Sequence, residues 1–215
     1  MIFISSCRPF DLDDTGVYQR TQLVAKESWD KVASKIVYFN NFEPELDSPK
    51  TAFIPSDRYV RLMDLIELAA RQNEWCAILN GDIVIGPGFQ MVEAKLRARK
   101  AQCASSWRFN YDPDIGLSSG VHNDNGLDFF AAVPEVWQKA YELVDERLYI
   151  ASGGWDQWAL SLFCTFFQPH FWNITNSRVI FHPQDSAHGP RTHGPRVMMD
   201  TVQTYGWPTM SSAHL

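Results

Sequence analysis

Cysteine is scarce in this sequence and never occurs in closely spaced pairs. The four cysteines of the 215-residue chain are Cys7, Cys76, Cys103 and Cys164, and they form no C-x-x-C pair and no Cys/His set at zinc-site spacing. A zinc knuckle and a dithiol redox motif are therefore excluded as sequence motifs. Isolated cysteines of this kind are typical of buried thiols in a protein from a reducing compartment.

Long apolar runs and an excess of positive charge are also missing. The longest apolar run, residues 158–167, is too short to cross a bilayer, and the first residues lack the basic and apolar regions of a secretory signal. The chain has 19 Lys+Arg against 25 Asp+Glu, a formal net charge of −6, without a block of like charges. We therefore expect a cytoplasmic protein without a membrane span, whose main partner is neither nucleic acid nor an anionic membrane.

The overall composition fits one folded domain with its own core. Hydrophobic residues make up 45% of the chain and charged residues 20%. A chain of this size buries roughly 70% of the surface that its unfolded form exposes, which is enough for a core without disulfides or a structural metal. Because no shift in composition marks a second domain, we expect residues 1–215 to form a single domain, with 182–215 as a candidate mobile C-terminal loop.

Short apolar, β-rich segments alternate with segments of helical periodicity. Strands are expected at residues 1–4, 35–40, 75–79, 102–106, 127–133 and 178–182. Helices are expected at residues 17–32, 57–72 with Ser56 as N-cap, 89–100, 134–148 with Pro134 in the first turn, and 155–167. This alternation predicts an α/β fold with a mixed, mostly parallel sheet flanked by helices. Residues 111–126 and 184–196 are expected to be long loops, and in such a fold loops and ligands gather at the carboxyl ends of the strands.

The segment after strand 75–79 contains the most informative candidate site. Asn80 and Asp82 lie at the carboxyl end of this apolar run, and Gly81 between them allows a ligand to approach the backbone closely. An amide oxygen and a carboxylate in this position suit a hard divalent ion that bridges to phosphate oxygens, such as Mg²⁺ or Mn²⁺. The tripeptide alone is equally typical of a β-turn, since Asn-Gly and Gly-Asp are common turn dipeptides.

Four short motifs occur in the order found in one enzyme family. They are Ser-Ser-Cys-Arg at 5–8, Asn-Gly-Asp at 80–82, Gly-Leu-Asp-Phe-Phe at 126–130 and Gly-Gly-Trp-Asp-Gln-Trp at 153–158, with His182 and His188 as a fifth match. On these motifs the chain resembles nucleotide-sugar-dependent glycosyltransferases of the GT-A fold, over most of its length. The resemblance implies a GT-A-like, Rossmann-like sheet. It also implies transfer of a sugar from a nucleoside-diphosphate sugar donor to a hydroxyl acceptor, whose identity the sequence does not reveal.

The resemblance further implies roles for individual residues. Asp82, with Asn80 in place of the first acid of the family's motif, corresponds to the carboxylate that holds Mn²⁺ or Mg²⁺ against the donor diphosphate. His182 or His188 would complete the shell of the ion. Asp156 corresponds to the acid that faces the acceptor and would act as general base. An acid in the first turn of a helix also complements the helix dipole, and this structural role explains Asp156 equally well.

Asp128 is a second candidate catalytic residue, because it lies between two apolar residues of an expected strand, where an unpaired carboxylate is costly. A structural pair with an arginine, or a position at the exposed start of the strand, is the alternative. The resemblance implies that Asp128 binds sugar or acceptor hydroxyls. Trp107 and Arg108 are candidates for its neighbours at the acceptor, and Trp155 is a candidate acceptor platform.

The remaining candidates are expected to bind the donor nucleotide and its diphosphate. For the nucleotide sugar they are Gly81, Ser5, Ser6, Arg8, Arg58 and Arg61. A charged helix face such as that of Arg58 and Arg61 is usually only solvated. For the diphosphate, which develops negative charge as it leaves, they are the loop residues His188, Arg191, His193 and Arg196. An unstructured basic tail is the alternative for this loop.

A competing signal lies near the start of the chain. Asp11 and Asp13 stand in a D-x-D-x-T pattern, which resembles the nucleophile motif of haloacid-dehalogenase-type phosphohydrolases. That chemistry needs a hydrophobic strand that leads straight into the first Asp, whereas Pro9 intervenes here and removes a ladder donor. We therefore rank a phosphohydrolase second, and a sugar-nucleotide-binding module without turnover third.

Overall fold

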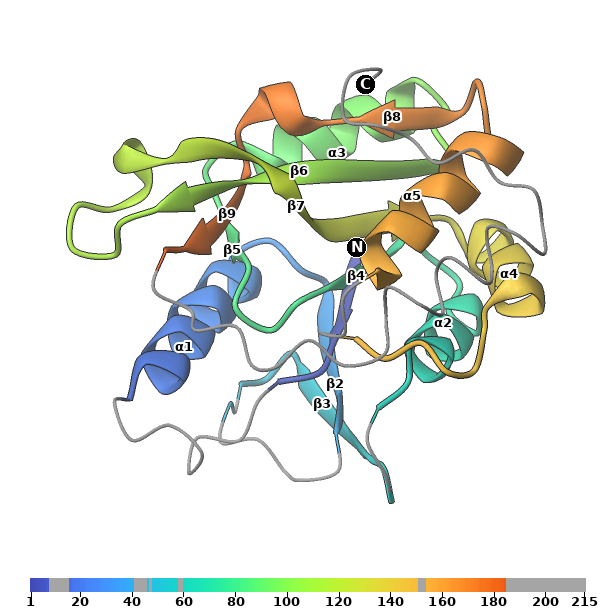
Figure 1. Cartoon of the computed structure of the whole chain (residues 1–215), viewed down its shortest axis with the longest axis horizontal. Helices are drawn as coiled ribbons and strands as arrows, with labels where there is room; N and C mark the ends of the chain where they lie inside the picture. The colour runs from blue at the N-terminus through green and yellow to red at the C-terminus, as the bar shows by residue number, and fades with distance from the viewer. Residues whose placement is uncertain (8–15, 41–45, 47, 58–59, 151–153, 185–215) are drawn as a thin grey trace.

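The computed structural model describes residues 1–7, 16–40, 46, 48–57, 60–150 and 154–184. Among them one nine-stranded sheet runs through the molecule, with helices on both faces (Figure 1). The strands are β1 (Ile2–Ser5), β2 (Lys35–Asn40), β3 (Thr51–Pro55), β4 (Cys76–Leu79), β5 (Val84–Ile85), β6 (Cys103–Tyr111), β7 (Val121–Ala132), β8 (Phe171–Asn173) and β9 (Ile180–Pro183). The helices are α1 (Val17–Asp30), α2 (Leu62–Ala70), α3 (Phe89–Ala98), α4 (Pro134–Leu143) and α5 (Trp155–Phe166).

The order of the strands brings distant parts of the chain together at the middle of the sheet. The order is β3-β2-β1-β4-β7-β6-β9-β5, and β8 pairs with β6 off this path. Strands β1 to β4 are parallel where they pair, whereas β7 runs antiparallel to both β4 and β6. The register pairs Leu79 with Phe129, so the residues just beyond this pair, Asn80 and Asp128, meet at the end of β4. The predicted mixed, mostly parallel α/β sheet is confirmed.

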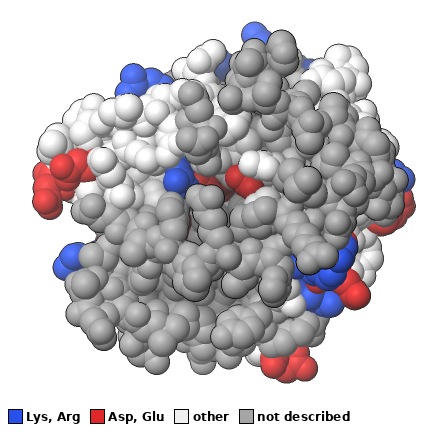
Figure 2. Space-filling model, in the orientation of Figure 1, with Lys and Arg blue, Asp and Glu red and all other residues white. Residues whose placement is uncertain are grey.

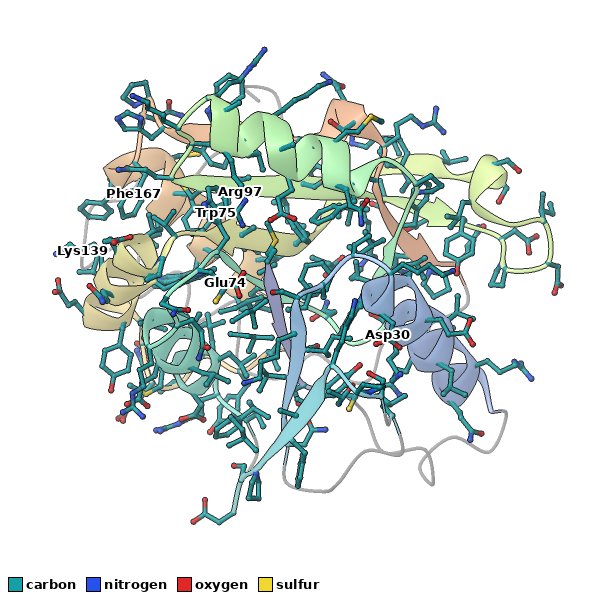
Figure 3. All side chains as sticks on the ribbon, turned by 180° about the vertical axis from the view of Figure 1, so that it is seen from behind. Asp30, Glu74, Trp75, Arg97, Lys139 and Phe167 are labelled. Atoms are coloured by element: carbon teal, nitrogen blue, oxygen red, sulfur yellow. The ribbon has the colours of Figure 1, made fainter. Side chains whose placement is uncertain are left out.

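Two apolar cores form because side chains alternate between the faces of each strand. Phe3 of β1 belongs to the core under α1 and α3, where its ring lies 5.8 Å from those of Trp29 and Phe89. The adjacent residues of β1, Ile2 and Ile4, belong to the core under α2, α4 and α5, together with Trp137 and Phe163. Figure 3, seen from behind, shows α1 and α3 in front of the sheet, and Figure 1 shows α5 on the opposite side.

Several predicted boundaries are wrong, each for a local reason. The loop expected at 111–126 is shorter than predicted and spans residues 112–120, because β6 runs to Tyr111 and β7 begins at Val121 as a two-stranded extension held by backbone pairing. Helix α2 begins at Leu62, and its N-cap is Arg61 and not the expected Ser56. The backbone N–H of Arg61 donates to the Asp64 carboxylate at 2.9 Å, which closes the cap. Helix α4 ends five residues early, where Val144 turns to extended backbone. Strands β3, β5 and β8 were not expected at all.

The cysteines behave as predicted. All four are free and buried, and burial raises the pKa of Cys7 and Cys76 to about 12 each, so these thiols stay protonated. Within the described parts of the chain, every helix is too short or too polar to cross a membrane.

Candidate functional site

The carboxyl ends of β1 and β4 lie side by side and form the floor of the candidate site. The hydroxyl of Ser5 donates to the carbonyl oxygen of Leu79 at 2.7 Å, and Ser5 itself is fully buried. A Cβ atom on Gly81 would lie 3.0 Å from the carbonyl oxygen of Ser6 and 3.2 Å from Cys7 Cα. A glycine is therefore what allows the Asn-Gly-Asp turn to approach the end of β1 this closely.

Asn40, at the end of β2, fixes the chain that follows β1. Its Oδ1 accepts hydrogen bonds from the hydroxyl of Ser6 at 2.7 Å and from the backbone N–H of Cys7 at 3.0 Å. Its Nδ2 donates to the sulfur of Cys7 at 2.9 Å. Asn40 was not among the predicted site residues, although its place at the carboxyl end of an expected strand was a usable signal.

A chain of polar side chains crosses the sheet from β4 to β6. Asn80 Nδ2 donates to Asp128 Oδ1 at 2.6 Å, and Arg108 Nη1 donates to Asp128 Oδ2 at 2.5 Å. Arg108 Nε continues the chain to Asn110 Oδ1 at 3.1 Å. Arg108 is 8% exposed and Asp128 6%, so the pair is shielded from water. Each charge is compensated by the other, and removal of either one would leave an uncompensated buried charge. The expected proximity of Arg108 to Asp128 is confirmed.

Gly126 makes room for Arg108, where β7 shifts its register against β6. A Cβ on Gly126 would overlap Arg108 Nε and lie 2.7 Å from both Cδ and Cζ. We predict that Gly126→Ala lowers the free energy of unfolding by about 1–3 kcal/mol, because the guanidinium is held on its other side by Asp128. Thermal unfolding checks this, with the same substitution made in an Arg108→Ala background. An equal loss in both backgrounds would contradict the proposed clash.

Asp156 is the second residue of α5, which begins directly after Gly154, whose φ of 103° favours glycine. Burial, and next the negative charge of Asp128, raise the pKa of Asp156 to about 6. Backbone N–H groups at the start of the helix and the charge of Arg108 act in the opposite direction. A carboxyl group with a pKa near neutrality, at the edge of a polar cluster, is suited to accept a proton.

Asp82 and His182 form the second polar group of the site. His182 Nε2 lies 3.4 Å from Asp82 Oδ2, and the His182 side chain is almost completely buried on β9. Burial, and next the charge of Asp82, raise the pKa of Tyr111, the last residue of β6. The register pairs His182 with Asn110, so this group adjoins the chain that begins at Asn80. Neither Asn110 nor Tyr111 was predicted, because each lies within the segment read as loop or next to it.

The residues present fit a hard divalent ion. Asn80 Oδ1 is buried and accepts no hydrogen bond from the described residues. An amide oxygen, a carboxylate and an imidazole, as in Asn80, Asp82 and His182, are ligand types that Mn²⁺ accepts. No cluster of three His, Cys, Asp or Glu side chains at metal-site geometry occurs in the described part of the chain. His188, the other predicted ligand, lies outside the described residues.

Three further candidates have structural partners. Arg61 bonds to Asp64 at 3.2 Å through its guanidinium, within the cap of α2, and lies 3.8 Å from Glu146. Trp155 is 3% exposed, with its ring edge-on to Phe130 at 5.4 Å, so it contributes to the core. Trp107 is partly buried, and its backbone N–H donates to Thr175 Oγ1 at 2.9 Å. The predicted nucleotide contact of Arg61 and acceptor contacts of Trp107 and Trp155 stay predictions.

Other candidates cannot be placed. Those outside the described residues are Arg8, Arg58, Arg191, His193, Arg196 and the two competing acids Asp11 and Asp13. Figure 2 shows acidic and basic side chains close to each other near the centre of the face seen in Figure 1.

Comparisons with known proteins identify the fold. No protein-family model matches the sequence, and no curated protein matches it significantly. The structure is similar to that of S. aureus TarS 1-349, solved in complex with UDP-GlcNAc, with a TM-score of 0.61, 9% identity, and coverage of 99% of this chain and 68% of that chain. It is also similar to a Bacillus anthracis protein assigned as a glucose-1-phosphate thymidylyltransferase, solved with sucrose, with a TM-score of 0.52, 11% identity, and coverage of 80% of this chain and 85% of that chain. These likenesses agree with the predicted GT-A-like, Rossmann-like fold class.

Proposed function

We propose that this protein is a glycosyltransferase that transfers a sugar from a nucleoside-diphosphate sugar to a hydroxyl acceptor. One observation supports it above all: the Asn80–Asp128–Arg108 chain lies at the carboxyl end of β4, and the charges of Asp128 and Arg108 both act on Asp156, a carboxyl group with a raised pKa. Ligands of open α/β sheets bind at this end of the strands. The fold shared with TarS, a protein solved with a nucleotide sugar, agrees with such a donor.

The side chains of Asp82 and His182 and the carboxamide oxygen of Asn80 are the groups that would hold Mn²⁺ or Mg²⁺. The bound ion would offset the negative charge of the donor diphosphate. The hydroxyl of Ser5 donates to Leu79 and that of Ser6 donates to Asn40, and both residues lie with Gly81 at the floor of the site. We assign the nucleotide to this side of the site. The predicted diphosphate contacts of His188, Arg191, His193 and Arg196 belong to this proposal as well.

Asp156 would perform the proton transfer. Its carboxylate accepts the proton of the acceptor hydroxyl while the new bond from the acceptor oxygen to the sugar forms and the bond from the sugar to the diphosphate breaks. The negative charge of Asp128, which is paired with Arg108, is one of the causes that raise the pKa of Asp156 and so favour its proton uptake. Asp128 was predicted as a second catalytic residue, and its partners favour a positioning role.

Thermal unfolding in the presence of UDP, GDP, ADP or CDP, each with and without Mn²⁺, tests the donor class. A ligand at 100 times its dissociation constant adds about 2.7 kcal/mol, which raises the midpoint by several degrees at about 2–4 °C per kcal/mol. We expect one diphosphate to stabilise the protein only with Mn²⁺. The shift should disappear in Asp82→Ala and persist in Glu142→Ala, which removes an exposed carboxylate of α4.

The other outcomes separate the competing functions. No shift with any nucleotide would overturn the proposal and direct the work to phosphatase substrates and Asp11→Asn. Binding of a nucleotide sugar without its turnover would indicate a binding module. Release of pyrophosphate from a nucleoside triphosphate and a sugar phosphate would instead indicate nucleotidyl transfer, which the likeness to the thymidylyltransferase makes worth measuring.

A further inference from the structure

The carboxylate of Asp128 has a donor on each of its two oxygens. Asn80 Nδ2 lies 2.6 Å from Oδ1, and Arg108 Nη1 lies 2.5 Å from Oδ2. These three side chains come from β6, β7 and the end of β4, so their meeting depends on the register of three strands. Arg108 is fixed from two further directions, by Asn110 Oδ1 and by the closely packed Gly126.

The partner of Asn80 determines which way its carboxamide faces. A carboxylate oxygen can only accept a hydrogen bond, so Asn80 must turn its nitrogen toward Asp128. Its oxygen then points away from Asp128, and this buried atom accepts no hydrogen bond from the described residues. An aspartate at position 80 would instead place a second carboxylate against Asp128 at hydrogen-bond distance, in a shielded place where like charges are costly.

We propose that Arg108 and Asp128 are positioning residues that hold the Asn80 carboxamide with its oxygen toward the ligand, and that Asp128 is the reason why position 80 has an amide and not an acid. That the Asn80 oxygen faces a ligand rests on the proposed function. The hydrogen-bonded unit of Asn80, Asp128 and Arg108 is independent of that function. Asn80 would then contribute a neutral oxygen to the ion, and Asp82 would be the one charged ligand from the end of β4.

An exchange of the two residues tests the unit directly. In Asn80→Asp/Asp128→Asn the carboxylate and the amide change places. The new amide at 128 can donate to position 80 and accept from Arg108, so the hydrogen bonds and the charge are both kept. We expect Asn80→Asp alone to lower the thermal midpoint by about 5 °C or more, and the double variant to recover to within about 2 °C of the original protein.

Asn110→Asp is the matched control, because it makes the same chemical change at the other end of Arg108. Its oxygen already accepts from Arg108 Nε, so an added charge there faces a cation, and we expect no loss of midpoint. An equal decrease of the thermal midpoint in Asn110→Asp and Asn80→Asp would overturn the proposal. The decrease would then come from any added negative charge and not from its position against Asp128. Additive effects of Asn80→Asp and Asp128→Asn would also overturn it, because residues that form one unit are coupled.

Mn²⁺ alone, titrated by calorimetry, tests the direction of the oxygen. The exchanged double variant presents a charged oxygen where Asn80 presents a neutral one, so we expect its Mn²⁺ affinity to rise by about tenfold or more. Unchanged affinity would overturn the ligand-facing role. If neither protein binds Mn²⁺ while the double variant still recovers its midpoint, the positioning unit stands and the metal-assisted function fails.

Discussion

Replacement of Asp156 by asparagine is expected to lower kcat by about 10²–10⁴-fold, the range that general-base catalysis usually contributes. The substitution keeps the shape of the side chain and the start of α5, but an amide cannot accept the acceptor's proton at neutral pH. Nucleotide binding, measured by thermal shift, should be retained. Glu135→Gln is the matched control, because Glu135 is an acid in the first turn of α4 and is exposed.

The pH dependence of the reaction follows from the same residue. Burial and the charge of Asp128 raise the pKa of Asp156 to about 6, and the base must be deprotonated to act. The rate should therefore rise with pH through about 6 and level off above it. A rate that is independent of pH between 5 and 8, or full activity in Asp156→Asn, would show that Asp156 is not the base.

Asp156 should also make the protein less stable at neutral pH. The folded state holds this proton up to about pH 6 and the unfolded chain only up to 3.8, so the free energy of unfolding falls as the pH rises between these values. The difference corresponds to about 3 kcal/mol at most. Asp156→Asn should accordingly be more stable than the original protein at pH 8 and not at pH 3, which pairs a gain in stability with a loss of activity.

Arg108→Met is expected to have the largest effect on stability. It removes the cation beside Asp128 and leaves a carboxylate in a place that is 6% exposed, which typically costs about 3–5 kcal/mol. At about 2–4 °C per kcal/mol this lowers the thermal midpoint by about 6–20 °C. Methionine keeps much of the arginine's apolar stem, so the loss reports on the charge more than on the packing.

Arg97→Met provides the comparison for this prediction. Arg97 forms an ion pair with Glu93 on α3, but its side chain is 45% exposed, and such surface pairs contribute about 0–1 kcal/mol. A difference of several degrees between the two variants is therefore expected in the same unfolding experiment. Similar midpoints for Arg97→Met and Arg108→Met would mean that the Arg108–Asp128 pair is not effectively shielded from water.

The sequence was sufficient to predict which polar residues lie at the ends of individual strands and helices. Asn80 and Asp82 follow a continuous apolar run, and Asp156 follows a glycine pair before an apolar helix, so their places at the ends of elements were readable from periodicity and turn chemistry. The α/β architecture followed from the same alternation. The contacts between these residues could not be predicted from periodicity and turn chemistry, because they depend on the order and register of the strands.

The errors are concentrated where backbone pairing, and not side-chain pattern, decides the structure. The polar part of β7 pairs with β6 although its Asp, Asn and Gly residues are typical of turns. Asn110 and Tyr111 were missed for this reason. Arg61 has a structural partner that was not predicted, the Asp64 carboxylate within the same helix cap, and only the start of α2 reveals it. The nucleotide contact of Arg61 stays a prediction.

The antiparallel course of β7 between β4 and β6 also sets the order in which the protein can be assembled during synthesis. The parallel strands β1, β2 and β4 can pair early, but β4 obtains its neighbour on the other side only after β7 has been made. Asp82 meets His182 later still, because β5, just after Asp82, pairs with β9. A ribosome-bound chain that stops before β9 would thus contain most of the sheet and the residues of the Asn80–Asp128–Arg108 chain, but it would lack the Asp82–His182 pair. Contacts of such long range form slowly.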